Sequence, residues 1–331
     1  MSALVEMTGE HVPVLAAEVI DLTAAKNGET VVDCTFGGGG HARLLAERVS
    51  PDGLVIGIDR DPAAHSRFED FAAQAGCATR FIHEDFEHAL AVLADEKLGA
   101  DVILLDLGVS SFQIDSLDRG FSYVYDAPLD MRMDPEQDFN ATDLINGWDE
   151  RNLSNIFDRY GEERYSRQIA REIVRRREVH PIATTEQLVE AIVSAIPTPA
   201  RFGAGHPAKR VFQAVRIAVN DELGQLERAL PLAWQALAVG GRMAVISFHS
   251  LEDRTTKRFF DDLAKDCVCP PEFPICTCDH KSQASVVSRR AISPGEDEVA
   301  ENPRARSSKL RVARKIADDR VPEALTGEGR R

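Results

Sequence analysis

The chain has 331 residues, of which 44% are hydrophobic; this excludes a disordered protein and accommodates two domains, or one domain with a large insertion. Its formal net charge of −15 argues against non-specific binding to nucleic acid, because phosphate contacts need Lys and Arg. The N-terminal residues lack the features of a signal peptide and no apolar run approaches the roughly 18 residues of a membrane helix, so we expect a cytoplasmic protein without a membrane partner.

The first hundred residues alternate short apolar runs with amphipathic segments. Asp61 is placed to cap a helix whose first position Pro62 can take. Apolar strands separated by helices are typical of a parallel sheet covered on both faces, so we predict an α/β fold. The expected strands are 30–34, 54–59, 80–83 and 101–106, and the expected helices cover 41–49 and the residues after Pro62.

The pattern changes after the fourth predicted strand, where the sequence becomes charged and rich in helix formers. Strand signals return near Gly240-Gly241. We therefore predict one α/β domain, formed by 1–114 and 216–331, that is interrupted by a helical insertion over 115–215. The later elements are expected to be an ordered loop over 118–135, helices over 142–180, 184–195 and 211–239, and a strand over 242–248.

A glycine cluster, Gly37 to Gly40, joins the first predicted strand to the first helix. Glycine lets the backbone reach positive φ and approach a ligand closely, and a helix N-terminus offers free N–H groups. Asp59 ends the second strand about twenty residues later, where a carboxylate accepts hydrogen bonds from a ribose diol. These features predict a nucleoside-cofactor site, although the spacing Gly37-x-Gly39-x-x-Ala42 also fits a dinucleotide such as NAD.

The ends of the later strands favour a methyltransferase over a dinucleotide-binding enzyme. Asp106 ends the fourth strand, and Asp85-Phe86 is expected to end the third, where an acid or an aromatic ring can meet an adenine. One such group at each successive strand end is the methyltransferase arrangement, and the sequence has no second glycine fingerprint for another nucleotide half. Ordinary capping of strand ends is the alternative for Asp59 and Asp106.

Four of the six cysteines crowd into one short segment, which is unlike the even spread of a secreted disulfide scaffold. Thiolates this close can form a tetrahedral zinc shell, but paired Cys-x-Cys steps are less usual than Cys-x-x-Cys. Bound zinc and reduced, unliganded thiols therefore both stay open. The four are Cys267, Cys269, Cys276 and Cys278.

Two windows are rich in Arg and Lys despite the negative net charge, and the second contains no acidic residue. Basic patches on an acidic protein suit a specific RNA target, and solvated helix faces or salt-bridge partners are the alternative. The windows are 164–177 and 304–315.

Blocks of sequence spread along nearly the whole chain carry a more specific signal. They are 11–15 (HVPVL), 35–41 (TFGGGGH), 58–62 (IDRDP), 104–111 (LLDLGVSS), 119–122 (RGFS), 128–134 (PLDMRMD), 160–164 (YGEER), 212–217 (FQAVRI), 246–254 (ISFHSLEDR) and 301–308 (ENPRARSS). In these blocks the chain resembles the bacterial ribosomal RNA small-subunit methyltransferase H family, also called MraW.

The resemblance implies a class I, Rossmann-like S-adenosylmethionine-dependent methyltransferase sheet with an inserted helical domain. Members of the family methylate N4 of a cytidine in 16S rRNA, so the expected partner is 16S rRNA, within the assembled small ribosomal subunit. The oligomeric state stays open. The cofactor-binding positions that the resemblance carries over are Gly39, Gly40, His41, Asp59, Phe86, Asp106 and Gln113.

The chemistry of the implied reaction suggests further roles. The exocyclic amine of cytosine is a poor nucleophile, so a site must orient it and accept hydrogen bonds from its N–H groups. We expect Asp106 to receive the amine with the hydroxyl of Ser110 or Ser111, and Phe112 to stack on the base. The insertion is expected to clamp the RNA through Arg132 and the arginine-rich helix.

Some readings of the sequence stay open. His249 and Ser250 either line the same pocket or serve as core or capping residues. An NAD-linked oxidoreductase rests on the glycine cluster plus Asp59. A non-catalytic RNA-binding or ribosome-assembly protein that retains a cofactor fold is the other alternative.

Overall fold

The computed structural model describes residues 13–109, 117–202, 205–267, 269, 273, 275, 277–278 and 281–317. The chain forms two compact units, Met1–Gly108 with Gln225–Arg331, and Val109–Gly224. The first unit is discontinuous in sequence and the second is one continuous stretch, which begins before and ends after the insertion expected over 115–215.

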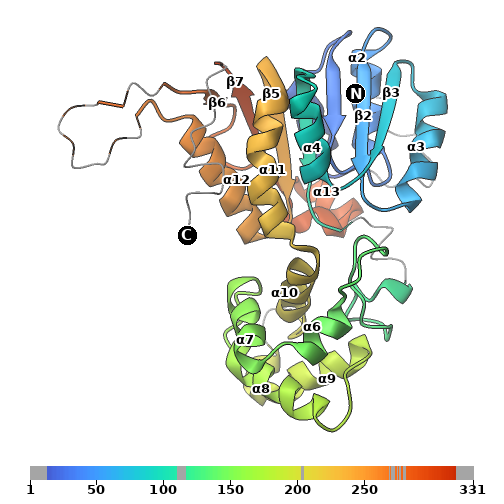
Figure 1. Ribbon diagram of the computed structural model, residues 1–331, viewed down its shortest axis with the longest axis vertical. Coiled ribbons are helices and arrows are strands. Elements are labelled where there is room, and N and C mark those ends of the chain that lie inside the picture. Colours follow the sequence, from blue (N-terminus) through green and yellow to red (C-terminus); the bar gives the residue numbers. More distant parts are fainter. Residues whose placement is uncertain are drawn as a thin grey trace. The chain divides into compact units, whose positions relative to one another are not determined.

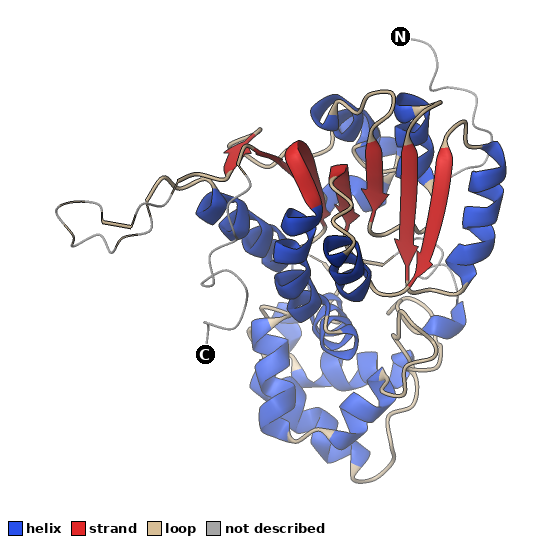
Figure 2. Ribbon diagram, turned by 45° about the horizontal axis from the view of Figure 1, so that its top comes forward, coloured by secondary structure: helices blue, strands red, loops and turns tan. Residues whose placement is uncertain are grey.

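In the described part of the chain, the first unit contains one seven-stranded sheet with the order β3-β2-β1-β4-β5-β7-β6 (Figure 1, Figure 2). Strands β1 to β5 are parallel, whereas β7 is antiparallel to both of its neighbours. The strands are β1 (Thr30–Asp33), β2 (Leu54–Asp59), β3 (Ala78–His83), β4 (Ala100–Asp106), β5 (Leu237–Ser247), β6 (Ala284–Val286) and β7 (Lys309–Lys315).

Helices cover both faces of this sheet. Successive residues of a strand point to opposite faces, so each strand packs against helices on both sides. Val32 and Ile103 pack into a buried cluster with α4, α11 and α12. Their neighbours Val31 and Val102 pack into a second cluster with α1, α2 and α3. The helices are α1 (Ala16–Thr23), α2 (Gly40–Val49), α3 (Ala63–Gln74), α4 (Phe86–Asp95), α11 (Glu222–Ala236), α12 (Ser250–Leu263) and α13 (Glu296–Glu301).

The far half of the sheet separates this fold from a dinucleotide-binding domain. Such a domain uses two similar parallel halves in the strand order 3-2-1-4-5-6. Here β7 lies between β5 and β6 and runs against both, so the described strands do not build a second parallel nucleotide-binding half. The described strands therefore give the NAD alternative no site for its second nucleotide half, although the glycine cluster and Asp59 on which it rests are present.

The second unit is helical and has its own core, to which Leu144, Phe157, Ile169, Ile192 and Val215 contribute. None of the helices in the described ranges combines the length and apolar character that a membrane crossing would require. The helices of this unit are α6 (Ala141–Gly147), α7 (Glu150–Arg159), α8 (Ser166–Arg177), α9 (Thr185–Ala195) and α10 (Lys209–Asn220), with short 3₁₀ turns η1 (Leu117–Arg119) and η2 (Thr198–Phe202).

Two long helices expected in this region are broken. The stretch 142–180 forms three helices, because Asp149 caps a new helix and Glu162 adopts a left-handed φ of 49° between α7 and α8. The stretch 211–239 is interrupted at Asp221, where φ is 48°, and its last residues belong to β5. Left-handed residues end a helix because they turn the chain away from the helical path.

Other differences concern element ends. Strand β3 ends at His83, so Asp85 and Phe86 do not end a strand: Asp85 caps α4 by accepting a hydrogen bond from the His88 N–H. Helix α3 begins at Ala63 with Pro62 at the N-cap, one residue later than expected, and the Asp61 side chain accepts a hydrogen bond from the Ala63 N–H. Elements for which no residue range was predicted are α1, α4, α12, α13, β6, β7 and the 3₁₀ turns η2 and η3 (Pro303–Ser307).

Candidate active site

Three aspartates end three neighbouring strands of the sheet. Asp33, Asp59 and Asp106 are the last residues of β1, β2 and β4. Because these strands are parallel and adjacent, their carboxyl ends lie at one edge of the sheet. In open α/β sheets this edge is where ligands bind.

Three side chains, those of Asp59, Arg67 and Arg43, form hydrogen bonds with the backbone of the glycine cluster at this edge. Gly37 and Gly39 have φ angles of 53° and 74°, which suit glycine. The Gly37 N–H donates to Asp59 Oδ2 at 2.7 Å, so Asp59 closes the loop as well as facing the edge. Arg67 Nε donates to the Gly37 carbonyl at 2.8 Å, and Arg43 Nη1 donates to the Gly38 carbonyl at 3.0 Å.

Close packing explains why side chains are excluded from this loop. A Cβ at Gly39 would lie 2.6 Å from the ring of Phe36, which is itself buried among other aromatic rings. A Cβ at Gly40 would lie 3.1 Å from Pro13. The start of α2 therefore presents bare backbone, which a cofactor can approach closely.

Asp106 is fixed through its backbone while its carboxyl group stays available. The Asp106 N–H donates to Thr35 Oγ1 at 2.7 Å, and the Thr35 N–H donates to Asp33 Oδ1 at 3.2 Å. Asp106 Oδ1 is buried and has no hydrogen-bond partner among the described residues. Since an unpaired buried polar atom is unfavourable, this oxygen marks a position that a ligand can satisfy.

The buried ring of His41 lies beside this carboxyl group. Its side chain is 6% exposed, and burial lowers the pKa of His41 to about 4, so the ring is neutral at pH 7. The Val14 carbonyl accepts from Nε2 at 2.9 Å, which leaves Nδ1 without a proton. Nδ1 lies 3.6 Å from Asp106 Oδ2, beyond hydrogen-bond length, so His41 packs beside the carboxyl group without a hydrogen bond to it.

The electrostatics of this edge favour a cationic ligand. Burial, with the charges of Asp33 and Glu252, raises the pKa of Asp106 well above its usual range. Burial likewise raises the pKa of Asp33 to about 7, with Asp59 contributing. These shifts mean that negative charge on the two carboxyl groups is unfavourable in the absence of a nearby positive charge, so a bound cation would favour their ionised form. The edge can therefore accommodate the positive charge of a sulfonium cofactor.

The structure describes only some of the other residues expected in the site. Phe86 is the first residue of α4 and is partly buried against the core below the sheet edge. His249 caps α12 by accepting a hydrogen bond from the Glu252 N–H, which is the capping role that the sequence left open. Ser110, Ser111, Phe112 and Gln113 lie outside the described residues.

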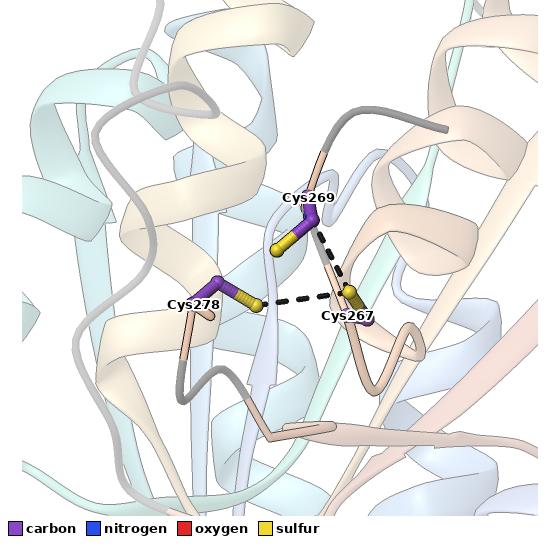
Figure 3. A group of neighbouring side chains, drawn as sticks. All are labelled: Cys267, Cys269 and Cys278. Atoms are coloured by element: carbon purple, nitrogen blue, oxygen red, sulfur yellow. Dashed lines mark hydrogen bonds between the residues drawn. The ribbon is translucent and has the colours of Figure 1, made fainter. Parts of the chain in front are cut away.

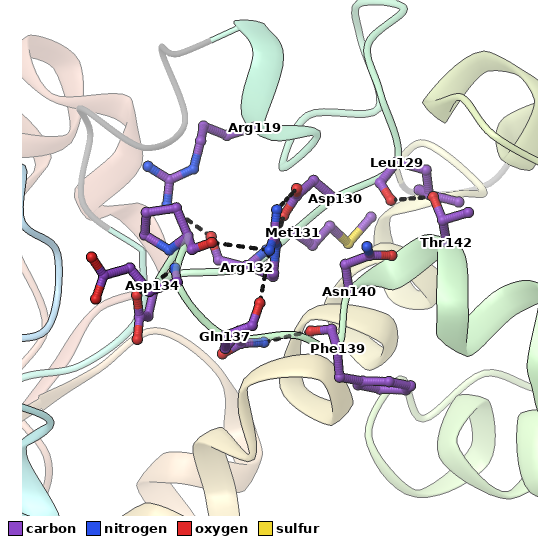
Figure 4. Close-up of polar contacts among 12 residues, drawn as sticks. Arg119, Leu129, Asp130, Met131, Arg132, Asp134, Gln137, Phe139, Asn140 and Thr142 are labelled. Carbon is purple, nitrogen blue, oxygen red and sulfur yellow. Dashed lines mark hydrogen bonds and ion pairs between the residues drawn. The ribbon is translucent and has the colours of Figure 1, made fainter.

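The arginines expected to clamp RNA are largely engaged within the protein. Arg132 donates through Nε and Nη2 to both oxygens of Asp130, and through Nη1 to the carbonyls of Pro135 and Gln137 (Figure 4). It therefore organises the 130–137 loop. In α8, hydrogen bonds from Arg175, with a further contribution from Arg176, lower the pKa of Glu172 to about 2.

Residues that the sequence analysis missed hold the site together. Thr35, Arg43 and Arg67 restrain the glycine cluster and the start of the Asp106 loop. Thr35 stands inside the quoted TFGGGGH block, so its place beside the glycines was the available signal. The sequence contained no signal for Arg67, because its contact with the Gly37 carbonyl spans 30 residues and depends on the packing of α3.

The family of the chain follows from comparison with known proteins. The model of the MraW methylase family matches residues 8–316. The chain belongs to the MraW methylase family. Its fold is accordingly the class I, Rossmann-like methyltransferase fold, here carrying a helical insertion.

The chain aligns with relatives over nearly their whole length. It is 47% identical over 312 residues to the ribosomal RNA small subunit methyltransferase H of Heliobacterium modesticaldum, covering 94% of this chain and 100% of that protein. Proteins of the same name from Symbiobacterium thermophilum and Geobacter sulfurreducens are each 49% identical over 311 residues, covering 94% of this chain and 98% and 100% of theirs. Membership in this methylase family and the cation-suited edge agree in pointing to S-adenosylmethionine use.

Proposed function

We propose that this chain transfers the methyl group of S-adenosylmethionine to the exocyclic N4 amine of a cytidine in 16S rRNA. The family and the names of its relatives support the reaction and the RNA class. The observation that carries the proposal is the Asp106 carboxyl group, whose buried Oδ1 lacks a partner among the described residues at the edge where β1, β2 and β4 end.

The residues at this edge fit S-adenosylmethionine. Gly39 and Gly40 would accept its close approach, Asp59 its ribose, and the acidic edge its positive charge. Phe86 and Gln113 complete the proposed binding set, and Gln113 follows from family resemblance alone. The bound cofactor supplies an electrophilic methyl group on a sulfonium.

Asp106 is the proposed acceptor for the amine. Its Oδ1 can accept a hydrogen bond whether or not the carboxyl group is protonated, while Oδ2 faces the unprotonated Nδ1 of His41. A hydrogen bond from the amine N–H orients the amine and increases the electron density on its nitrogen. Such positioning supplies up to roughly 7–11 kcal/mol of the barrier. Ser110 remains a proposed second contact to the amine.

RNA contact is proposed for the second unit, but not through Arg132. That side chain is engaged by four oxygens of its own loop. Arg167 of α8 is exposed and forms no ion pair with the described residues, so it is the better candidate for a phosphate contact. A paired cytidine must leave its stack before chemistry, and contacts of this kind would hold the RNA strand while the base opens.

The decisive experiment uses labelled S-adenosylmethionine and small ribosomal subunits from cells that lack this gene, followed by digestion to nucleosides. Label in N4-methylcytidine is the expected result, because the amine is the proposed nucleophile. Label in another nucleoside would contradict the target atom but keep the methyltransferase. Cofactor binding without turnover on subunits or naked 16S rRNA would favour the non-catalytic assembly protein, and binding of NAD in its place would favour the oxidoreductase.

A further inference from the structure

Three cysteine side chains converge in the segment that links α12 to β6 (Figure 3). Cys267 and Cys269 lie on the α12 side of this segment, and Cys278 lies nearer to β6. Their sulfur atoms all lie within 4.8 Å of one another. None of the three is in a disulfide. The site is separate from the sheet edge described above and plays no part in the proposed transfer.

The spacing of the sulfurs matches a metal shell. Cys267 Sγ and Cys278 Sγ are 3.8 Å apart. A tetrahedral shell with Zn–S bonds of about 2.3 Å places neighbouring sulfurs about 3.8 Å apart. A disulfide would need about 2.05 Å, so these thiols are arranged as separate ligands around a shared point.

Backbone N–H groups also point at the sulfurs. The Cys269 N–H donates to Cys267 Sγ at 3.4 Å, and the Thr277 N–H donates to Cys269 Sγ at 3.4 Å. Hydrogen bonds of this kind favour the thiolate over the thiol, and thiolates are the form that binds metal. The segment thus holds its sulfurs in orientations that suit coordination.

We propose that Cys267, Cys269 and Cys278 bind a single Zn²⁺ ion. The ion would link the two arms of this segment, of which one contains Cys267 and Cys269 and the other contains Cys278. The arms already meet at their base, where the Gln283 N–H donates to the Leu263 carbonyl at 2.8 Å. Beyond that bond Phe273 and Ile275 are exposed, so apolar burial gives the segment little support. A soft thiolate set selects zinc over Mg²⁺ or Ca²⁺, and binding releases the thiol protons.

The first test measures metal in protein purified under reducing conditions without chelator. We expect about one zinc ion per chain, retained on gel filtration. Addition of Co²⁺ to the reduced, metal-free protein should give thiolate-to-cobalt charge-transfer bands and the visible bands of tetrahedral cobalt, which Zn²⁺ then abolishes. Absence of zinc together with absence of these bands overturns the proposal, as does the absorption of an iron–sulfur cluster.

Variants locate the ion. Cys267→Ser, Cys269→Ser and Cys278→Ser should each lower zinc content at least about tenfold, whereas Cys77→Ser, a cysteine of the sheet region, should retain it. Zinc that persists in all three variants overturns the assignment. Cys276 lies outside the described residues, so Cys276→Ser tests separately whether its thiolate is the fourth ligand of the ion. Circular dichroism checks folding, and the cobalt spectrum of the unmodified protein does not depend on any variant.

The structural role has a separate readout. Removal of the ion by a chelator should speed proteolytic cleavage within 264–283 at least about tenfold, because local opening governs cleavage. Cleavage elsewhere in the first unit should keep its rate. Equal cleavage within the segment with and without zinc would show that the ion does not fasten its arms.

Discussion

A Cβ at Gly39 would lie 2.6 Å from the Phe36 ring, at a position where φ is +74°. Gly39→Ala should therefore lower the free energy of unfolding by about 2–3 kcal/mol and weaken S-adenosylmethionine binding at least tenfold. Urea denaturation and calorimetric titration measure the two effects. Gly28→Ala is the matched control, because Gly28 has a φ of +84° and nothing within 4 Å of a Cβ.

Only the backbone strain should appear in Gly28→Ala, with a loss of about 1 kcal/mol and unchanged cofactor affinity. Equal effects of the two substitutions would mean that the contact with Phe36 has no consequence.

Asp106 is expected to act in turnover more than in folding. Asp106→Ala should lower kcat at saturating S-adenosylmethionine by at least about 10², because the amine loses its acceptor. Single-turnover assays with small subunits measure this. Asp101→Ala at the start of the same strand removes a hydrogen bond to the Thr30 N–H, so it should lower stability and leave kcat unchanged. Wild-type turnover by Asp106→Ala would exclude the proposed role.

Asp33 should make stability depend on pH. Burial raises the pKa of Asp33 to about 7 from an ordinary value of 3.8, so the folded state holds this proton more tightly than the unfolded state. The stabilisation is complete below about pH 4, is lost as the pH rises to about 7 and is constant above. Asp33→Asn should therefore gain up to about 4 kcal/mol over the wild type between pH 4 and pH 8.

Urea denaturation of both proteins at intervals across this range tests the expectation. Parallel stability profiles would show that Asp33 titrates in the folded protein as it does in the unfolded chain.

At the scale of elements, the loop 130–137 depends on one guanidinium group. Arg132→Ala should lower the free energy of unfolding by about 2–3 kcal/mol, because a carboxylate and two carbonyls lose their donor. Arg167→Ala should change it by less than about 0.5 kcal/mol and raise the KM for subunits. Thermal unfolding and steady-state assays measure these effects; a stable Arg132→Ala with a raised KM would return Arg132 to the RNA surface.

The strands that bear the site could be predicted because each is a buried apolar run ending in an aspartate. Strand β7 was missed for a physical reason. Its alternation of apolar and basic residues is typical of a half-buried strand, but its basic residues were interpreted as part of a patch that binds RNA. Arg311 instead pairs with Asp253, and Lys315 donates to the buried carbonyls of Trp234 and Leu237.

Within the site, local signals were readable and distant contacts were not. The glycine cluster, Asp59 and Asp106 stand at strand ends that hydrophobic pattern alone locates. His41 could only be carried over by resemblance, because its partner Val14 lies 27 residues away and its pairing depends on how α2 packs. Helix breaks at Glu162 and Asp221 escaped for the same reason, since left-handed backbone at non-glycine residues is set by tertiary packing.

The charge of the whole molecule bears on its substrate. A net charge of −15, with many arginines paired internally, leaves little general attraction for RNA. Recognition should then depend on shape and local contacts, and we expect assembled small subunits to be methylated at least about tenfold faster than naked 16S rRNA. Initial rates on the two substrates at equal concentration test this, and equal rates would remove the preference.

The place of β7 also sets the order in which the molecule can be completed during translation. The helical unit is continuous and emerges from the ribosome before β5, so it can fold while β1 to β4 still lack their neighbour. The sheet closes only when Lys309–Lys315 emerges and enters between β5 and β6. Until then the nascent chain carries an open strand edge, which is the part of a sheet most prone to aggregation.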